Sequence, residues 1–333
     1  MSHMSDATPK PIFVVGMNGS GTTMLAECLG RHPEIYMFPQ ESYVLPHYIN
    51  KSRSYGDLGQ LMVRRKLAQD LTGHTAYWLV NGKSNVKVPD EFLSEPGIAG
   101  VIDGVYRYFS AKAAKHGVLH WGDKTPMYIQ HVELLANTFN NAKFIHIYRD
   151  GRDIAQSLHR RWRFNPCRSI YRWRETMQTA KELRASFGEE KFYEVSYEQL
   201  TEKPESNLRD ICLFLELPFN TSILKSAMPH MDKIAANDME KFVRNSGKWK
   251  SYFSSEDIVR LEAIAGKMLR ERGYEVMTDA GNNSPGGLRR LVWIVHDRAQ
   301  SVIIAYRTFG FAFLKNAARR VRDSLIQSKT SRY

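Results

Sequence analysis

The sequence predicts a three-layer α/β fold, in which helices flank a mainly parallel central sheet and a helical extension follows at the C-terminus. Short apolar runs alternate along the chain with segments of helical periodicity, an order typical of parallel sheets. A glycine-rich turn directly follows the first apolar run. The composition agrees, because 333 residues, 43% of them hydrophobic, are enough to build the core of one large domain.

Residue periodicity and helix-boundary residues place the expected elements. We expect buried strands at 12–16 and 143–149, an alternating strand at 191–200, and a first helix from near Ser20 to just before Pro33. Further helices are expected at 101–117, 128–139, 153–162, 204–217 and 254–273. The mixed, polar stretch 51–97 is expected to form helices and loops that cover the site.

The chain divides into one domain and two flanking segments. Residues 1–10 are polar and expected to be disordered, with S-H-M typical of an expression-tag remnant, and 11–278 is the expected domain. A linker at 279–287 leads into 286–333, which is apolar and basic together. We expect an amphipathic helical appendage there, either packed on the domain or on a second copy, or lying on a membrane surface.

The net charge of +12 favours polyanionic partners: nucleic acid, anionic lipid, or a small molecule that carries several phosphates. The three cysteines, Cys28, Cys167 and Cys212, are scattered without metal-binding spacing, which predicts unpaired thiols in a reducing, cytoplasmic compartment. No run of roughly 18 apolar residues occurs, so no spanning helix is expected.

The stretch P-I-F-V-V-G-M-N-G-S-G-T-T-M-L-A-E-C, residues 11–28, predicts a phosphate-binding loop. After a buried strand, the backbone N–H groups of such a turn point at one spot, and the dipole of the next helix adds positive potential. Gly16 and Gly21 keep the spacing of the ATPase loop G-x-x-x-x-G-K-[ST], but Thr22 stands in place of its lysine. This replacement, and the lack of an obvious acidic metal-binding strand, argue against Mg-ATP chemistry.

A second segment, 144–161, reads F-I-H-I-Y-R-D-G-R-D-I-A-Q-S-L-H-R-R. Arg149 ends a predicted strand and Ser157 lies two turns into the next helix, so Arg149, Arg152 and Ser157 are expected near one end of the sheet. A guanidinium fork with a hydroxyl suits a phosphate dianion. Salt bridging within R-D-G-R-D is the alternative interpretation.

Together the two segments resemble the sulfotransferases that use 3′-phosphoadenosine 5′-phosphosulfate (PAPS). In that family a [K/R]-S-G-T-T loop cradles the 5′-phosphosulfate and an R-D…S segment binds the 3′-phosphate. The resemblance implies a P-loop-containing fold, PAPS as sulfonate donor and no metal. The implied cofactor-binding residues of the two motifs are Asn18, Gly19, Ser20, Gly21, Thr22, Thr23, Arg149 and Ser157.

Later segments resemble the same family with less specific motifs, closest to its tyrosylprotein-type branch. G-D-K-T-P at 122–126 resembles the loop whose lysine reaches the phosphosulfate, which implies Lys124. The segment 32–46 implies Glu41, followed by Ser42, as the base; a solvated carboxylate is the alternative. His120 is a second candidate base, although a histidine near a sheet end is more often a packed residue.

Two further resemblances concern the nucleotide. V-S-Y-E-Q-L, residues 195–200, resembles the strand whose tyrosine packs near the adenine, which implies Tyr197; a plain strand aromatic is the alternative. The segment 243–253 resembles the basic loop that closes over the nucleotide, with Arg244 and Lys248 as candidates.

One position departs from the family pattern: Gly19 stands where a lysine or arginine usually precedes S-G-T-T. That cation stabilises charge on the bridging oxygen, and removing one preorganised contact of this kind costs on the order of 100-fold or more in rate. Either another cation, such as Lys124, covers the role, or the chain is an impaired relative. We expect compensation, because Glu41, Lys124 and the predicted 3′-phosphate clamp are present.

The resemblance implies in-line transfer of a sulfonate from PAPS to a hydroxyl or amine of a small molecule, lipid or glycan. Glu41 would take the acceptor proton, and Thr22 and Lys124 would face the leaving oxygen. The alternatives are a P-loop kinase and a protein that only binds nucleotide or polyanion; nucleic acid, supported by net charge alone, is not the expected partner. Segments 44–100 and 160–190 are expected to line the acceptor site.

Overall fold

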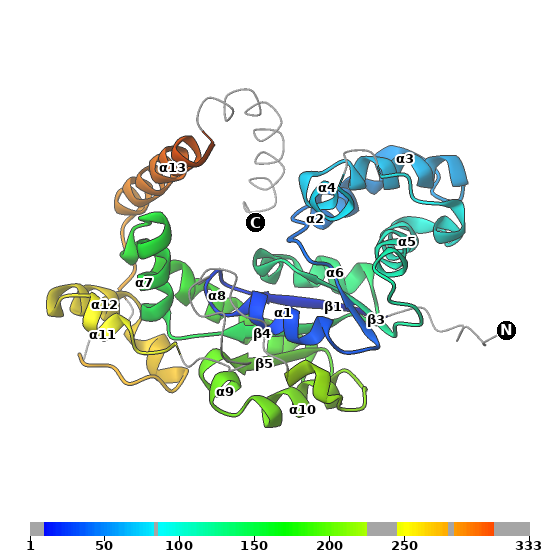
Figure 1. Ribbon diagram of the computed structural model, residues 1–333. Helices are drawn as coiled ribbons and strands as arrows, with labels where there is room; N and C mark the ends of the chain where they lie inside the picture. The colour runs from blue at the N-terminus through cyan, green and yellow to red at the C-terminus, as the bar shows by residue number, and fades with distance from the viewer. Residues whose placement is uncertain (1–9, 83–85, 225–244, 279–282, 310–333) are drawn as a thin grey trace.

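A five-stranded parallel sheet with strand order β2-β3-β1-β4-β5 forms the centre of the computed structural model, which describes residues 10–82, 86–224, 245–278 and 283–309 (Figure 1). The strands are β1 Lys10–Gly16, β2 Ile35–Met37, β3 His120–Lys124, β4 Lys143–Tyr148 and β5 Phe192–Ser196. Every pair of neighbours runs parallel. The predicted α/β class is therefore confirmed.

Helices cover both faces of the sheet, because alternate residues of the central strands are apolar and fully buried. Ile12 and Val14 of β1 pack on one side with α1, α9 and α10, and Phe13 packs on the other with α5, α6 and α8. Figure 1 shows α9 and α10 below the sheet and α5 and α6 above it. The bounds are α1 Thr22–Gly30, α5 Gly97–Lys112, α6 Val132–Thr138, α8 Pro166–Phe187, α9 Tyr197–Glu202 and α10 Pro204–Phe214.

A helical lobe lies over the β2–β3 side, as expected for 51–97. It contains α2 Leu45–Lys51, α3 Leu61–Thr72 and α4 Thr75–Asn81, with the 3₁₀ turns η1 Ser52–Tyr55 and η2 Asp90–Leu93. Its core side chains, among them Tyr48, Leu67 and Tyr77, join the cluster that contains Phe13 of β1. The lobe is thus built onto the face of the sheet that carries α5 and α6.

A second helical group lies beyond β4. It consists of α7 Gly151–Trp162, α8, α11 Trp249–Tyr252 and α12 Ser255–Glu271. The short 3₁₀ turn η4 Thr221–Leu224 lies elsewhere, where Ile223 packs in the cluster that contains α1 and α10. Met17 of the turn after β1 packs into the core of the second helical group with Trp173. The group therefore contacts the predicted phosphate loop directly.

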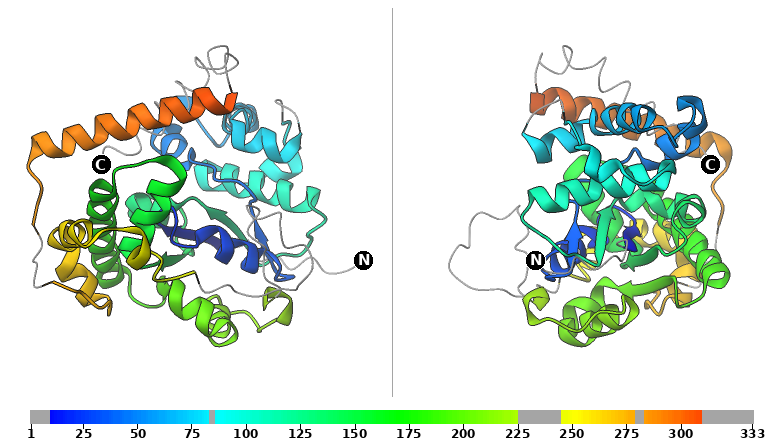
Figure 2. Two further views of the ribbon diagram at one scale, coloured as in Figure 1. Left: turned by 60° about the vertical axis from the view of Figure 1, so that its left-hand side comes forward. Right: turned by 90° about the vertical axis from the view of Figure 1, so that its right-hand side faces the viewer.

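The last described helix, α13 Gly287–Phe309, lies at the edge of the domain (Figure 2). Trp293 and Asp297 are buried on its inner side, and Asp297 accepts hydrogen bonds from the Asn165 N–H (2.7 Å) and from Arg168 Nη1 (2.7 Å). The expected appendage is thus helical over 287–309 and docks on the α7–α8 connection. The expected disordered start, apart from Lys10, and the stretch 310–333 lie outside the described residues.

Several sequence-based boundaries need correction. The predicted strand 191–200 ends at Ser196, whose side chain caps α9, so Tyr197 begins a helix rather than lying on a strand. The predicted helix 128–139 is a 3₁₀ segment, η3 Pro126–His131, followed by α6. Two strands were missed: β2 has three residues, and β3 reads H-W-G-D-K, a polar run that is nevertheless fully buried.

Candidate active site

The turn between β1 and α1 has a backbone that requires glycine at several positions. Gly19 and Gly21 have φ angles of 93° and 102°, in the left-handed region. A Cβ atom at Gly21 would lie 2.7 Å from Cδ2 of Tyr197, and one at Gly16 would lie 2.5 Å from the carbonyl oxygen of Ile147. The loop therefore passes close against β4 and α9, as a phosphate cradle at a helix N-terminus does.

One polar side chain of this loop, that of Ser20, is buried, and its hydroxyl has no hydrogen-bond partner among the described residues. In the described residues, no side chain caps the N-terminus of α1 and its first turn contains no acidic residue. Thr22 is buried and Thr23 is exposed. Since buried donors normally find a partner, the unused groups fit an anionic ligand.

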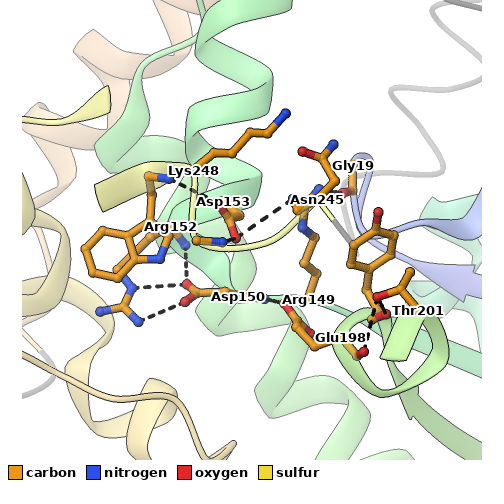
Figure 3. A network of polar contacts seen from close by, with 12 residues as sticks. Gly19, Arg149, Asp150, Arg152, Asp153, Glu198, Thr201, Asn245 and Lys248 are labelled. Atoms are coloured by element: carbon orange, nitrogen blue, oxygen red, sulfur yellow. Dashed lines mark hydrogen bonds and ion pairs between the residues drawn. The ribbon is translucent and has the colours of Figure 1, made fainter. Parts of the chain in front are cut away.

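Arg149 follows β4 and reaches the loop. Its Nη1 lies 3.4 Å from the Gly19 carbonyl oxygen, its Nη2 donates to the Asn245 carbonyl oxygen, and its guanidinium lies 4.6 Å from the ring centre of Tyr197 (Figure 3). Ser157 faces the same loop, because a Cβ at Gly19 would lie 3.9 Å from its hydroxyl oxygen. The structure thus brings together both motifs that the sequence singled out.

The segment after Asn245 is fixed by a carboxylate that the sequence did not point to. Asp153, on α7, accepts hydrogen bonds from the N–H groups of Gly247 (2.7 Å) and Trp249 (3.1 Å), and its Oδ2 lies 3.8 Å from Arg149 Nη2. Burial raises the pKa of this carboxyl. The sequence signal for Asp153 was its i, i+4 spacing from Arg149. That spacing could not reveal the N–H groups of Gly247 and Trp249, which lie about 95 residues away in sequence.

Arg152 does not join the clamp. It is buried between Asp150 (2.8 Å) and Glu262 (2.6 Å), with its guanidinium 3.8 Å from the ring centre of Trp249. Arg152 lies near the end of the sheet as expected, but its pair with Asp150 matches the alternative interpretation, salt bridging within R-D-G-R-D. It anchors the start of α7 instead.

Lys124 and Glu41 form an ion pair at the ends of β3 and of the segment that follows β2. Lys124 Nζ lies 2.6 Å from Oε1 of Glu41, and Lys124 is 8% exposed. The Tyr43 hydroxyl donates to Oε2 of Glu41. Both residues line a cavity of about 330 Å³, which we call the acceptor cavity; His74 and Leu79 also line it.

A buried hydrogen-bond network holds the Glu41 segment against β3. The Ser42 hydroxyl pairs with the Tyr128 hydroxyl (2.6 Å), and the Ser42 N–H donates to the Thr125 hydroxyl (3.1 Å), which donates to Asp123 (2.6 Å). Tyr106 also donates to Asp123, and burial raises the pKa of that carboxyl. This network fixes the carboxylate of Glu41 relative to Lys124, and only the structure reveals it.

The remaining predicted site residues are Lys248, Arg244 and His120. Lys248 is exposed at the N-terminus of α11, and Arg244 lies outside the described residues. His120 begins β3, at the opposite end from Lys124, and its ring nitrogens bond the carbonyl oxygens of Lys10 (2.9 Å) and Leu215 (3.0 Å). His120 is therefore a packed residue and not a base in this site.

A further arginine, Arg161, lies one helical turn beyond Ser157 on α7, and its side chain is exposed. Partial burial and the charges of Arg160 and Arg149 lower the pKa of its guanidinium.

A family model described as "Sulfotransferase family" matches residues 11–221, more than half of the chain. The chain belongs to the sulfotransferase family. This agrees with the resemblance inferred from the two motifs, and the matched residues include β1, the loop, Glu41, Lys124 and the Arg149–Ser157 segment.

Curated relatives of this sulfotransferase family member include two animal enzymes. The chain is 25% identical over 289 residues to the protein-tyrosine sulfotransferase of Drosophila melanogaster, covering 79% of this chain and 51% of that protein. It is 23% identical to protein-tyrosine sulfotransferase A of Caenorhabditis elegans, covering 79% and 67%. The chain thus spans about half the length of the Drosophila relative.

Solved sulfotransferase domains share the fold. The sulfotransferase domain from the Synechococcus PCC 7002 olefin synthase has a TM-score of 0.51 and 21% identity, covering 78% of this chain and 96% of that one. The sulfotransferase domain from the curacin biosynthetic pathway has a TM-score of 0.50 and 20% identity, covering 80% and 99%. No helix in the described ranges is long and apolar enough to cross a membrane.

Proposed function

We propose that this sulfotransferase family member transfers a sulfonate group from PAPS to a hydroxyl or amine of a small molecule, lipid or glycan. The proposal rests on one observation: three sets of polar groups lie side by side at the carboxyl ends of neighbouring strands. The Lys124–Glu41 pair lies at β3, the glycine-rich loop follows β1, and Arg149 follows β4. A kinase is disfavoured, because Thr22 replaces the lysine that a Mg-ATP loop uses.

The donor side of the site suits a nucleotide that carries a phosphate group at both the 5′ and the 3′ position of its ribose. The loop Asn18–Thr23 presents glycine backbone and the unpaired Ser20 hydroxyl to a 5′-phosphosulfate. Arg149 and Ser157 would bind the 3′-phosphate, and the unpaired Nε of Arg149 supports this role. Tyr197 would pack near the base, and Lys248, with Arg244 as a further expected ligand, would close over the nucleotide. The bound donor supplies an activated sulfonate.

On the acceptor side, different residues would take the acceptor proton and stabilise the charge that develops on the leaving oxygen. Glu41 would take the proton of the acceptor hydroxyl, after exchanging the Tyr43 hydroxyl for the acceptor at Oε2. As the bond from the acceptor oxygen to sulfur forms, the bond from sulfur to the 5′-phosphate breaks, and its electron pair stays on the phosphate oxygen. Lys124 and the Thr22 hydroxyl would stabilise that oxygen. The acceptor cavity would admit the acceptor.

Replacing Arg149 tests the donor site. We expect Arg149→Ala to weaken the binding of adenosine 3′,5′-bisphosphate by about 1–3 kcal/mol, roughly 5- to 150-fold, because a charge-assisted contact to the 3′-phosphate is lost. Isothermal titration calorimetry measures the change. Arg209→Ala, an exposed arginine on α10, is the matched control. Equal affinity in wild type and Arg149→Ala would remove Arg149 from the site.

Replacing Glu41 tests the chemistry. Glu41→Gln keeps the shape of the side chain and an acceptor for Lys124, but it cannot take a proton. We expect turnover to fall by on the order of 100-fold or more, the usual share of general base catalysis, with unchanged nucleotide affinity. Mass spectrometry of an acceptor panel incubated with PAPS measures turnover, with Glu205→Gln, at an exposed glutamate of α10, as control. Unchanged turnover in Glu41→Gln excludes Glu41 as base; a protein that binds nucleotide but sulfates no acceptor favours the binding-protein alternative.

The outer face of α13 supports a second proposal, that this helix contacts an anionic membrane surface in the predicted cytoplasmic compartment. Exposed apolar residues recur at helical spacing: Leu288, Leu291, Val292, Val295, Val302 and Ile303. Exposed arginines flank them at 289, 298 and 307, while the only acidic residue of the helix, Asp297, faces inward. An apolar stripe with basic flanks matches a membrane surface with negative charge.

Vesicle co-sedimentation tests this surface. We expect the protein to bind phosphatidylglycerol vesicles and to bind neutral phosphatidylcholine vesicles much more weakly. Replacing Leu291 and Val295 by Glu should reduce binding by about tenfold or more, since each apolar side chain that leaves the interface loses about 1.5–3 kcal/mol. Absence of vesicle binding, together with a dimer in light scattering that the double variant converts to monomer, would show instead that a second copy covers the stripe.

A further inference from the structure

The loop lacks a cation of its own. The two cations assigned to this site, Lys124 and Arg149, already have partners within the protein. Gly19 has no side chain, and its φ of 93° is a conformation that L residues rarely adopt. Lys124 is paired with Glu41 at 2.6 Å. Arg149 is engaged with the carbonyl oxygens of Gly19 and Asn245. If sulfonate transfer occurs here, a third positive charge would complete the site.

Arg172, on α8, lies across a small cavity from the loop. The cavity has a volume of about 40 Å³, and Gly16, Met17 and Asn18 form one of its walls. Leu158 and Trp162 are among its apolar lining residues. The cavity thus adjoins the first residues of the loop and the second half of α7. We call it the loop cavity.

The guanidinium of Arg172 has no hydrogen bond or ion pair to any residue in the described ranges, whereas its neighbours on α8 do. Arg168 is paired with Asp297 at 2.7 Å, and the charge of Asp297 also acts on Arg172 without a direct ion pair. Arg174 donates to the Ile264 carbonyl oxygen (3.0 Å) and to Glu175. Burial lowers the pKa of Arg172, and the charge of Arg168 adds to this effect. A partly buried guanidinium without a direct ion pair gains free energy when an anion reaches it.

We propose that Arg172 contacts the sulfonate of the bound donor through the loop cavity and supplies the positive charge that Gly19 does not. This inference rests on the proposed function. A guanidinium presents a planar fork of N–H donors, which suits the oxygens of a sulfonate. Asn18, Gln130 and Thr176 also line the cavity and could donate further hydrogen bonds to an anion there. Arg172 thus compensates for Gly19 from a different element of the fold.

The inference can be tested by comparing the binding of two ligands that differ only in the sulfonate. This comparison does not require the acceptor to be known. Calorimetry compares PAPS with adenosine 3′,5′-bisphosphate on wild type, on Arg172→Gln and on Arg184→Gln, an exposed arginine of the same helix as matched control. We expect Arg172→Gln to weaken PAPS binding by about tenfold or more while the bisphosphate binds as before. Arg184→Gln should change neither affinity. Intact PAPS is verified by mass spectrometry after each titration.

The outcomes separate the inference from the function on which it rests. Equal weakening of both ligands in Arg172→Gln, or no change in either, overturns the role of Arg172 while the donor site stands. A wild-type protein that binds neither ligand overturns the proposed function itself. If Arg172→Gln does not fold, Arg172→Lys replaces it: the charge without the fork should give an intermediate loss of PAPS affinity, and wild-type affinity for PAPS in Arg172→Lys counts against a sulfonate contact through the fork.

Discussion

The parallel register of β1 between β3 and β4 is the constraint on which the whole site depends. Val14 pairs with Lys124, and Gly16 pairs with Ile147, so β3, the loop and Arg149 emerge side by side at one edge of the sheet. A shift of one residue would turn every buried side chain of β1 to the other face. The apolar residues on both faces therefore fix the register, and the register fixes the spacing of the polar groups.

Buried charges of two kinds surround this edge. Arg152 is balanced within the protein by Asp150 and Glu262, and it stabilises the start of α7 without a ligand. Arg149 contacts backbone carbonyl oxygens and, at 3.8 Å, the Asp153 carboxylate, which also holds the segment after Asn245. Lys124 is paired with a carboxylate that the proposed reaction needs free. Cations held in place like Arg149 and Lys124 suit a site for an anionic nucleotide, because they need little rearrangement when the ligand binds.

The sequence predicted the motifs well because their chemistry is local. The glycine loop, Arg149 and Ser157 each lie within a short stretch whose strand–turn–helix context can be read from residue types. The sequence could not place Asp153, Tyr128 or Arg172, because their partners come from segments that only the fold brings together. Strand β3 was missed for a related reason: its Asp and Lys look like loop residues, yet its position between β2 and β1 buries them.

The proposed two-ended binding of the nucleotide can be measured directly on the wild-type protein. Calorimetry should compare adenosine 3′,5′-bisphosphate with adenosine 5′-phosphate, which lacks the 3′-phosphate, and with ATP and magnesium. If the loop and the Arg149–Ser157 clamp act together, the bisphosphate should bind at least about tenfold more tightly than either competitor, since two or more charge-assisted contacts are at stake. Equal affinity for the bisphosphate and adenosine 5′-phosphate, or tighter binding of ATP with magnesium, would contradict a clamp for the 3′-phosphate and with it the assignment of this site to PAPS.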